Sequence, residues 1–265
     1  MDGQTILQQR KSELTSPLEG ERHGRRHVSE ISPLPKADGR EFYEPLTKPR
    51  QLKPVYIKDI DTRRHKKVAL AVKMAYLWAE RKRAGYEDIS LILSGDNGTG
   101  KTHIARAIWW SMVQLVTDSS DKPIEGYQPQ PVGKFYMSNE LLGLMGNSCD
   151  PVTGILTPAS PHNVIGTPPM VVIDDLGAEQ IIPFVHHDDQ EEERQARLFK
   201  VVDYCYARQI SIIITTNLEI EAFKSFVGRR SWDRLVQMAP RLPNGDSFIV
   251  DMFGVPSYRL ESSGR

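Results

Sequence analysis

The sequence predicts an α/β fold, in which helices flank a parallel β-sheet. Five short apolar runs have the length and composition of strands, and they span 89–93, 133–137, 170–174, 210–215 and 247–252. The first of them, ISLIL, is almost continuously apolar, as expected for a parallel strand that is buried on both faces. Stretches with helical spacing separate these runs, and this alternation is typical of a doubly wound sheet.

The predicted helices are recognised by apolar residues that recur every three or four positions. They cover about 64–85, 104–116, 139–145, 192–208, 220–226 and 230–238. Two segments, 147–169 and 178–190, interrupt the pattern with Pro, Gly, Ser, Thr or clustered charge. We therefore expect both to be long surface loops.

Composition excludes some classes of protein. The chain has 34 basic and 34 acidic residues among 265, so any binding to DNA must come from local patches rather than from net charge. The N-terminal residues lack the apolar stretch of a signal peptide, and no run approaches the roughly 18 apolar residues of a membrane helix. We expect a cytoplasmic protein with no membrane partner.

Residues 1–60 differ in composition from the rest of the chain. They are rich in charge, Pro, Gly and Ser, and their apolar residues show no sustained period. We expect a disordered arm here, followed by one catalytic domain over 61–265. The basic run RHGRRH at 22–27 is a candidate for phosphate contacts, although such charge runs are usually just solvated. An arm that folds on a protein partner is the alternative to DNA contact.

A phosphate-binding loop follows the first predicted strand. Residues 95–102 read GDNGTGKT, the pattern G-x-x-x-x-G-K-T, and a predicted helix comes directly after them. Glycines allow the backbone to curl its N–H groups around phosphate oxygens, and the lysine adds a positive charge. We expect ATP to contact Gly95, Asn97, Gly98, Thr99, Gly100, Lys101, Thr102 and His103. The Thr102 hydroxyl is also a candidate Mg²⁺ ligand.

Two acidic residues end the predicted strand at 170–174. The sequence MVVIDD places Asp174 and Asp175 at the carboxyl edge of the sheet, where ligand sites of open α/β sheets form. We expect Asp174 to hold Mg²⁺ and Asp175 to polarise the attacking water. A loop start is the alternative interpretation of two such acids.

Two further candidates are an amide and an arginine. Asn217 follows the strand SIIITT and is suited to orient water near the γ-phosphate, although a helix cap before Glu219 would also explain it. Arg230 lies in GRRSWDRL, at the start of a predicted helix. One of these arginines can reach the ATP site of a neighbouring subunit, but helix arginines are more often surface or ion-pair residues.

Read together, these motifs resemble a known family. In order and spacing, they resemble the DnaC/IstB group of AAA+ ATPases. The segments that carry the resemblance are LILSGDNGTGKTHIARAI, KFYMSNELLGLM, MVVIDDLGAE, IIITTNLEIEAF, GRRSWDRL and GVPSYRL. The resemblance runs from about residue 64 to 260, and its most specific parts are IDDLG and the pairing of DRL with SYR. The segments 1–58, 147–169 and 178–190 depart from the family pattern.

The resemblance implies an AAA+ P-loop domain with a five-stranded parallel sheet, a truncated C-terminal lid and an oligomeric, DNA-associated ATPase. It implies that Asn217 occupies the first sensor position and that Arg230 is the finger acting in trans. Arg234 would accompany that finger, and Arg259, in SYR, would be the second sensor that contacts nucleotide.

The resemblance leaves two partners open. A helicase loader would grip single-stranded DNA and recruit a replicative helicase, and this is the favoured reading. A transposition regulator like IstB or TnsC would instead coat duplex DNA and recruit a transposase. A small-molecule kinase would share the phosphate loop but would leave TTN and GRRSWDRL without a function. A non-hydrolysing ATP-gated scaffold gains some support because the side chain of Asp175 is shorter than the Glu that many related ATPases have there.

Overall fold

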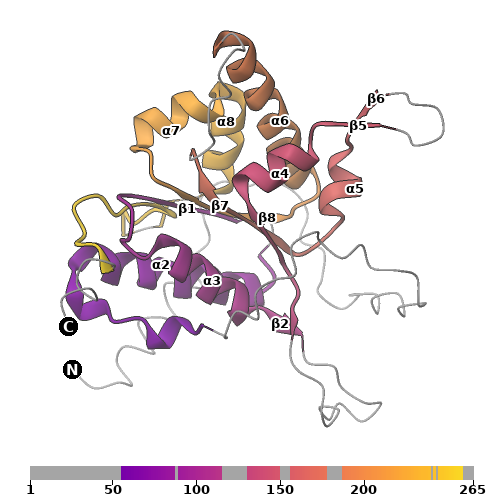
Figure 1. Cartoon of the computed structure of the whole chain (residues 1–265). Coiled ribbons are helices and arrows are strands. Elements are labelled where there is room, and N and C mark those ends of the chain that lie inside the picture. Colours follow the sequence, from indigo (N-terminus) through magenta and orange to yellow (C-terminus); the bar gives the residue numbers. More distant parts are fainter. Residues whose placement is uncertain are drawn as a thin grey trace, which may run out of the picture. The chain divides into compact units, whose positions relative to one another are not determined.

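A computed structural model describes residues 55–86, 89–114, 130–149, 156–177, 187–239, 241–242 and 244–258 of the chain. Its centre is a five-stranded sheet in the order β4-β7-β8-β1-β9 (Figure 1). The strands are β1 (Ser90–Ser94), β4 (Lys134–Met137), β7 (Met170–Leu176), β8 (Ser211–Thr216) and β9 (Ile249–Asp251). Every neighbouring pair in this sheet is parallel. The α/β prediction and all five predicted strands are confirmed.

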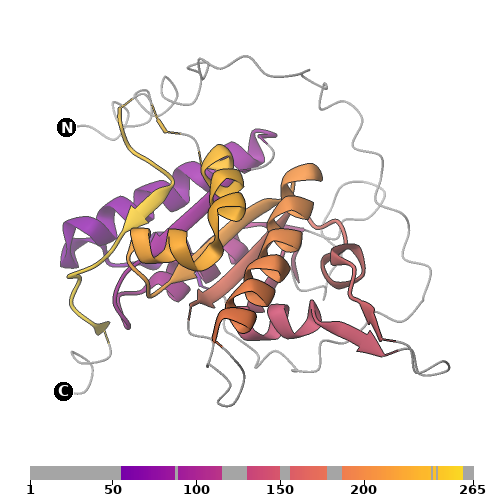
Figure 2. The same cartoon turned by 90° about the horizontal axis from the view of Figure 1, so that it is seen from above.

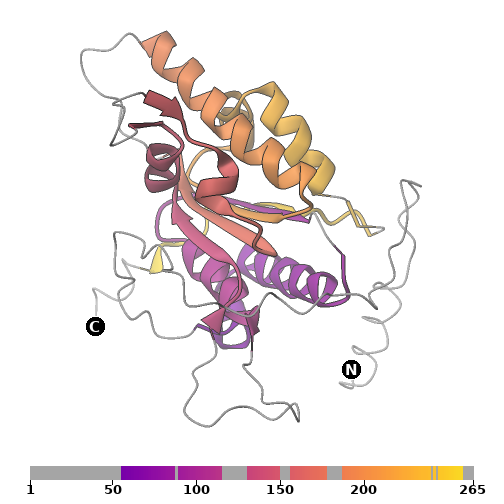
Figure 3. The same cartoon turned by 90° about the vertical axis from the view of Figure 1, so that its right-hand side faces the viewer.

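Helices cover both faces of the sheet, which makes three layers (Figure 3). One face carries α2 (Lys66–Arg83) and α3 (Lys101–Ser111), whereas the other carries α4 (Ser138–Leu144), α6 (His187–Ala207), α7 (Ile220–Val227) and α8 (Arg229–Met238). Seen from above, α6, α7 and α8 lie over the strands (Figure 2). None of the helices in the described part of the chain is long and apolar enough to cross a membrane.

The alternation of side chains along the strands divides the core into two. In β1, Leu91 and Leu93 pack in the cluster under α2 and α3, whereas Ile92 belongs to the cluster under α6 and α8. All three side chains are fully buried. Because successive strand residues point to opposite faces, a strand buried on both faces must be apolar throughout. This explains why a continuous apolar run in the sequence correctly predicted β1.

The helix after the phosphate loop is shorter than predicted. It ends at Ser111, and Val113–Gln114 forms strand β2, which pairs antiparallel with β3 (Gln130–Pro131). The Ser111 hydroxyl donates to the carbonyl of Ile108 at 2.6 Å, which satisfies a carbonyl of the last turn. A local helical period in the sequence does not reveal this strand pairing, since the partner strand is distant in sequence.

The two predicted loops contain regular structure. Segment 147–169 holds the hairpin of β5 (Asn147–Cys149) with β6 (Leu156–Pro158) and the short helix α5 (Pro161–Ile165). Ser160 caps α5 by accepting from the His162 N–H, and proline is favourable in this first turn. The expectation of a long surface loop is therefore wrong for the described part of this segment.

The second predicted loop, 178–190, overlaps α6. This helix begins at His187 rather than at 192, and ion pairs Glu191–Arg194 and Glu193–Arg197 link successive turns near its start. Such pairs at three- and four-residue spacing stabilise a helix that lacks an apolar stripe there. The prediction of a loop is therefore wrong for 187–190, whereas 178–186 lie outside the described residues.

The described chain begins with two short 3₁₀ helices, η2 (Ile57–Asp59) and η3 (Thr62–Arg64). Ile57 is buried in the core cluster under α2 and α3. The expectation of disorder is wrong for 55–60, which are ordered here, whereas 1–54 lie outside the described residues. The truncated C-terminal lid and the division at 60/61 stay predictions.

Candidate nucleotide-binding site

The phosphate loop joins β1 to α3 as predicted. Gly98 and Gly100 have φ of 80° and 100°, values that residues with a side chain rarely adopt. A Cβ at Gly98 would also lie 2.0 Å from the Ser257 hydroxyl. Gly100 is the N-cap of α3, so the N-terminal end of that helix faces the loop. This geometry presents backbone N–H groups and a positive helix end, which suit an anion.

The Lys101 side chain lies inside the phosphate loop. Its side chain is buried, and its ammonium donates to the carbonyls of Gly95 at 2.6 Å and Asp96 at 2.8 Å. Thr99 tightens the same turn by donating its hydroxyl to Asp96 O at 2.9 Å. The loop is thus held in its curled form by its own side chains.

The loop opens into a pocket of about 840 Å³. The pocket is lined by most of the predicted nucleotide contacts, namely Asn97, Gly98, Thr99, Gly100, Lys101, Thr102 and His103, and also by Asp174 and Asp175. Burial and the nearby Arg106 guanidinium lower the pKa of His103, which favours its neutral form. The carboxyl edge of the sheet therefore brings phosphate loop and acids together, as the sequence indicated.

Asp174 is the buried acid of the pair. It is 2% exposed, and its Oδ1 accepts from the Thr215 hydroxyl at 2.5 Å. Burial raises the pKa of Asp174, and hydrogen bonds from Thr215 and Thr102 oppose that rise. A buried carboxylate beside a threonine hydroxyl offers the hard oxygen donors that Mg²⁺ prefers, so these residues fit the ion.

Asp175 adopts a left-handed backbone with φ of 59°. Its N–H donates to the Thr215 hydroxyl at 2.8 Å, and its carbonyl accepts from Ser138 Oγ at 2.9 Å. The pairing of β7 with β8 shifts register between Ile173 and Leu176, at this same point. Such a backbone costs free energy in a residue other than glycine, and strain of this kind is concentrated at functional sites.

Asn217 and Arg259 are not placed in the pocket. Asn217 follows β8 but does not line the pocket, and its buried Oδ1 has no hydrogen-bond partner among the described residues. Arg259 lies outside the described residues, although the preceding Tyr258 lines the pocket. Both assignments stay predictions.

The two arginines of α8 differ in their surroundings. Arg230 is exposed, lies 5.9 Å from the Phe199 ring centre and is not part of the pocket lining. Arg234 contacts α6 of its own chain, with an ion pair to Asp203 at 3.3 Å and a position 4.3 Å over the Tyr206 ring. Arg234 therefore has a structural role in cis, whatever else it does.

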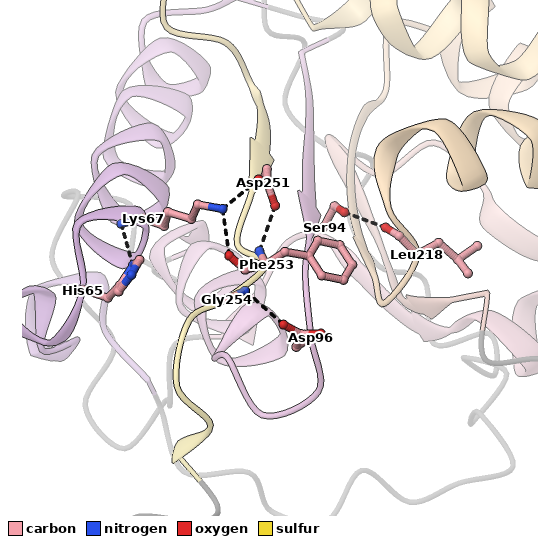
Figure 4. Close-up of polar contacts among 8 residues, drawn as sticks. All are labelled: His65, Lys67, Ser94, Asp96, Leu218, Asp251, Phe253 and Gly254. Carbon is pink, nitrogen blue, oxygen red and sulfur yellow. Dashed lines mark hydrogen bonds and ion pairs between the residues drawn. The ribbon is translucent and has the colours of Figure 1, made fainter.

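The segment 252–258 packs against the phosphate loop, and its last residue, Tyr258, lines the pocket. Its backbone bonds the phosphate loop twice, from Tyr258 N to Gly98 O at 2.9 Å and from Gly254 N to Asp96 Oδ2 at 3.0 Å. Figure 4 shows that Lys67 of α2 fastens the same segment, since its ammonium contacts Asp251 Oδ2 at 2.8 Å and Phe253 O at 2.7 Å. The loop is consequently tied to α2 through this segment.

Sequence reasoning missed several residues of the pocket. Asp59, Ile60, Asp61 and Val68 line it from before β1, and Tyr258 lines it from the far end of the chain. The Arg64 guanidinium stacks 3.3 Å from the Tyr258 ring centre. Local pattern gave no signal for the first four, because they reach the pocket only through the packing of η2, η3 and α2. The motif GVPSYRL marked this stretch of the sequence, but it led to Arg259 and not to Tyr258.

Comparisons with known proteins identify the family of the matched residues. The family model for the "ATPase family associated with various cellular activities (AAA)" matches residues 91–237, which is more than half of the chain. No curated protein matches the sequence. Among solved structures, the chain is similar to the crystal structure of the DnaI, with TM-score 0.48, 18% identity and coverage of 76% of this chain and 88% of that chain. It is also similar to the DnaC helicase loader, with TM-score 0.43, 18% identity and coverage of 71% and 90%.

Replacing Lys67 tests the tie between α2 and the phosphate loop. In Lys67→Met we expect the dissociation constant for ATP to rise about threefold to tenfold. The segment that contains Gly254 loses its ion pair to α2, and the Gly254 N–H then holds Asp96 of the phosphate loop less firmly. The measurement is titration with a fluorescent ATP analogue.

Lys73→Met is the matched control. Lys73 lies on the same helix and makes an ion pair of the same 2.8 Å length, with Asp246, which is not a pocket residue. Both variants should lose a similar, small amount of stability, typical of exposed ion pairs. Equal ATP affinity in the two variants would contradict the proposed tie.

Proposed function

Since the chain belongs to the AAA family of ATPases, we propose that it hydrolyses Mg²⁺-bound ATP in the described pocket and couples hydrolysis to its own assembly on DNA. The convergence of the phosphate loop with Asp174 and Asp175 in one pocket supports the hydrolytic part. The partner and the DNA preference rest on the resemblance of its motifs to the DnaC/IstB group.

The proposal gives a task to each residue of the phosphate loop and the acids, and to Asn217 outside the pocket lining. Lys101 and the loop N–H groups neutralise the phosphates, and Thr102 and Asp174 hold Mg²⁺, which would balance charge on the transferred phosphoryl group. Asp175 accepts a proton from, or orients, the attacking water. Asn217 orients the same water from the end of β8.

The position of Arg230 carries the proposal of an oligomer. This arginine is exposed, makes no ion pair within the described residues, and lies outside the pocket of its own chain. If it acts on phosphate, it therefore acts in the pocket of a neighbouring subunit, where it would neutralise developing charge. We therefore propose a homo-oligomer with composite sites.

We favour a helicase loader that acts on single-stranded DNA. In that role the ATP state of the oligomer would control its grip on the strand, and residues 1–60 would recruit a replicative helicase. A transposition regulator that assembles on duplex DNA uses the same composite site, and the DNA experiment below separates the two.

Lys101→Ala should abolish ATP turnover. The ammonium supplies the charge on the terminal phosphates, and no other lysine lines the pocket among the described residues. Phosphate release measures the loss, and intact turnover in this variant would remove the assignment of the site.

Arg230→Ala should lower turnover about a thousandfold while ATP binding persists, as expected for a finger acting in trans. Mixing Arg230→Ala with Lys101→Ala subunits should restore part of the activity, because one subunit supplies an intact loop and the other an intact arginine. Arg229→Ala is the matched control, since its neighbouring side chain is 93% exposed, and it should keep normal turnover. Failure of mixing to restore activity would exclude action in trans.

DNA should stimulate turnover and enlarge the oligomer. We expect single-stranded DNA to raise the ATPase rate and the particle size measured by light scattering, whereas duplex DNA has little effect. Stimulation and filament growth on duplex alone would replace the loader with the transposition regulator. No response to either DNA would overturn the DNA-associated function.

A further inference from the structure

Thr215 bridges the two acids of the pocket although it does not itself line the pocket. We propose that Thr215 is a positioning residue, whose hydroxyl sets the carboxylate of Asp174 for Mg²⁺ and the backbone of Asp175 for catalysis. The inference rests on the proposed function of this pocket and assigns a residue that acts through both acids.

The direction of each hydrogen bond follows from the donors available. The Asp175 N–H can only donate, so the Thr215 oxygen accepts this bond at 2.8 Å. The hydroxyl proton is then free for Asp174 Oδ1, which lies at 2.5 Å. A hydroxyl has one donor and two acceptor positions, and the arrangement uses the donor and one of these acceptors. One side chain thereby contacts both the carboxylate of Asp174 and the backbone of Asp175.

The strained backbone of Asp175 explains why these hydrogen bonds are needed. Its φ of 59° is unfavourable for a residue with a Cβ, and it persists only where the surroundings over-determine it. Thr215 holds the N–H of Asp175, and Ser138 at the start of α4 holds its carbonyl at 2.9 Å. The two hydroxyls thus secure both sides of the strained residue.

The surroundings of Thr215 make its hydroxyl specific. It lies on β8, between β7 and β1, is 1% exposed, and follows a run of three buried isoleucines. A valine would fill the same space and suit the strand equally well. Only the hydroxyl distinguishes threonine here, so packing alone does not explain the residue.

The test compares Thr215→Val with Thr215→Ser, using ATP-analogue affinity with Mg²⁺ and with EDTA, and steady-state kcat and KM. In Thr215→Val we expect the affinity for the analogue in EDTA to equal that of the unmodified chain. The increase in this affinity on adding Mg²⁺ should be about tenfold smaller, and kcat should fall at least about tenfold. Thr215→Ser keeps the hydroxyl and should recover both to within about threefold.

Ser211→Ala is the matched control for a lost buried hydroxyl on the same strand. Ser211 lies at the opposite end of β8, where its oxygen accepts from Ile89 N at 3.2 Å. This variant should lose stability in urea while its kcat and Mg²⁺ dependence stay unchanged. A purely structural role for Thr215 would make the two variants behave alike, which would overturn the inference.

Ser138→Ala keeps the inference testable if Thr215→Val does not fold. It removes only the bond to the Asp175 carbonyl, so kcat should fall while the gain from Mg²⁺ stays normal. An unchanged kcat in Ser138→Ala would contradict the idea that hydrogen bonds to the Asp175 backbone position this residue for catalysis. Absence of Mg²⁺-dependent hydrolysis in the unmodified chain would instead remove the proposed function, whereas normal hydrolysis with an unaffected Thr215→Val removes the inference alone.

Discussion

The parallel pairing of β1 with β8 positions the whole candidate site. Ser94, the last residue of β1, lies opposite Thr216, and Gly95 N continues the ladder by donating to Thr216 O at 3.1 Å. The phosphate loop therefore leaves the sheet beside the end of β8. Because β7 pairs with the other side of β8, Asp174 reaches the same edge. A shift of this register would separate the acids from the loop.

A second constraint comes from the C-terminal segment. Met252 N donates to Ser94 O at 2.6 Å, and a Cβ at Gly95 would lie 2.7 Å from the Met252 backbone. The start of the phosphate loop thus packs directly on the chain that follows β9. Since Lys67 fastens that chain to α2, a change in one of these elements is transmitted to the loop. The pocket depends on both ends of the described domain.

The two acids are held by different means, and this suits their proposed tasks. Asp174 is buried and bound to Thr215, so its carboxylate has a fixed place, as a metal ligand requires. Asp175 is partly exposed, has a strained backbone and is one of the residues that line the pocket. Arg230, by contrast, is exposed on α8, as its proposed action in a second subunit requires.

The sequence by itself determined the fold class, the loop GDNGTGKT and the acids of MVVIDD. These features are encoded locally, since a strand buried on both faces must be apolar and a phosphate loop needs glycine at fixed spacing. The regular structure within 147–169 and the start of α6 at His187 escaped local reading, because ion pairs and hairpin pairing replace an apolar period there.

Only the tertiary structure decided which distant residues complete the pocket. Ile60 and Val68 precede β1 and Tyr258 follows β9, yet all three line it. Thr215 stood in the sequence as one hydroxyl of TTN, and nothing local distinguished it from Thr216. Its role emerged because β7 and β8 lie side by side, which places its hydroxyl between Asp174 and the Asp175 N–H. Hydrogen bonds between strands depend on register, and register is set by the packing of the whole sheet.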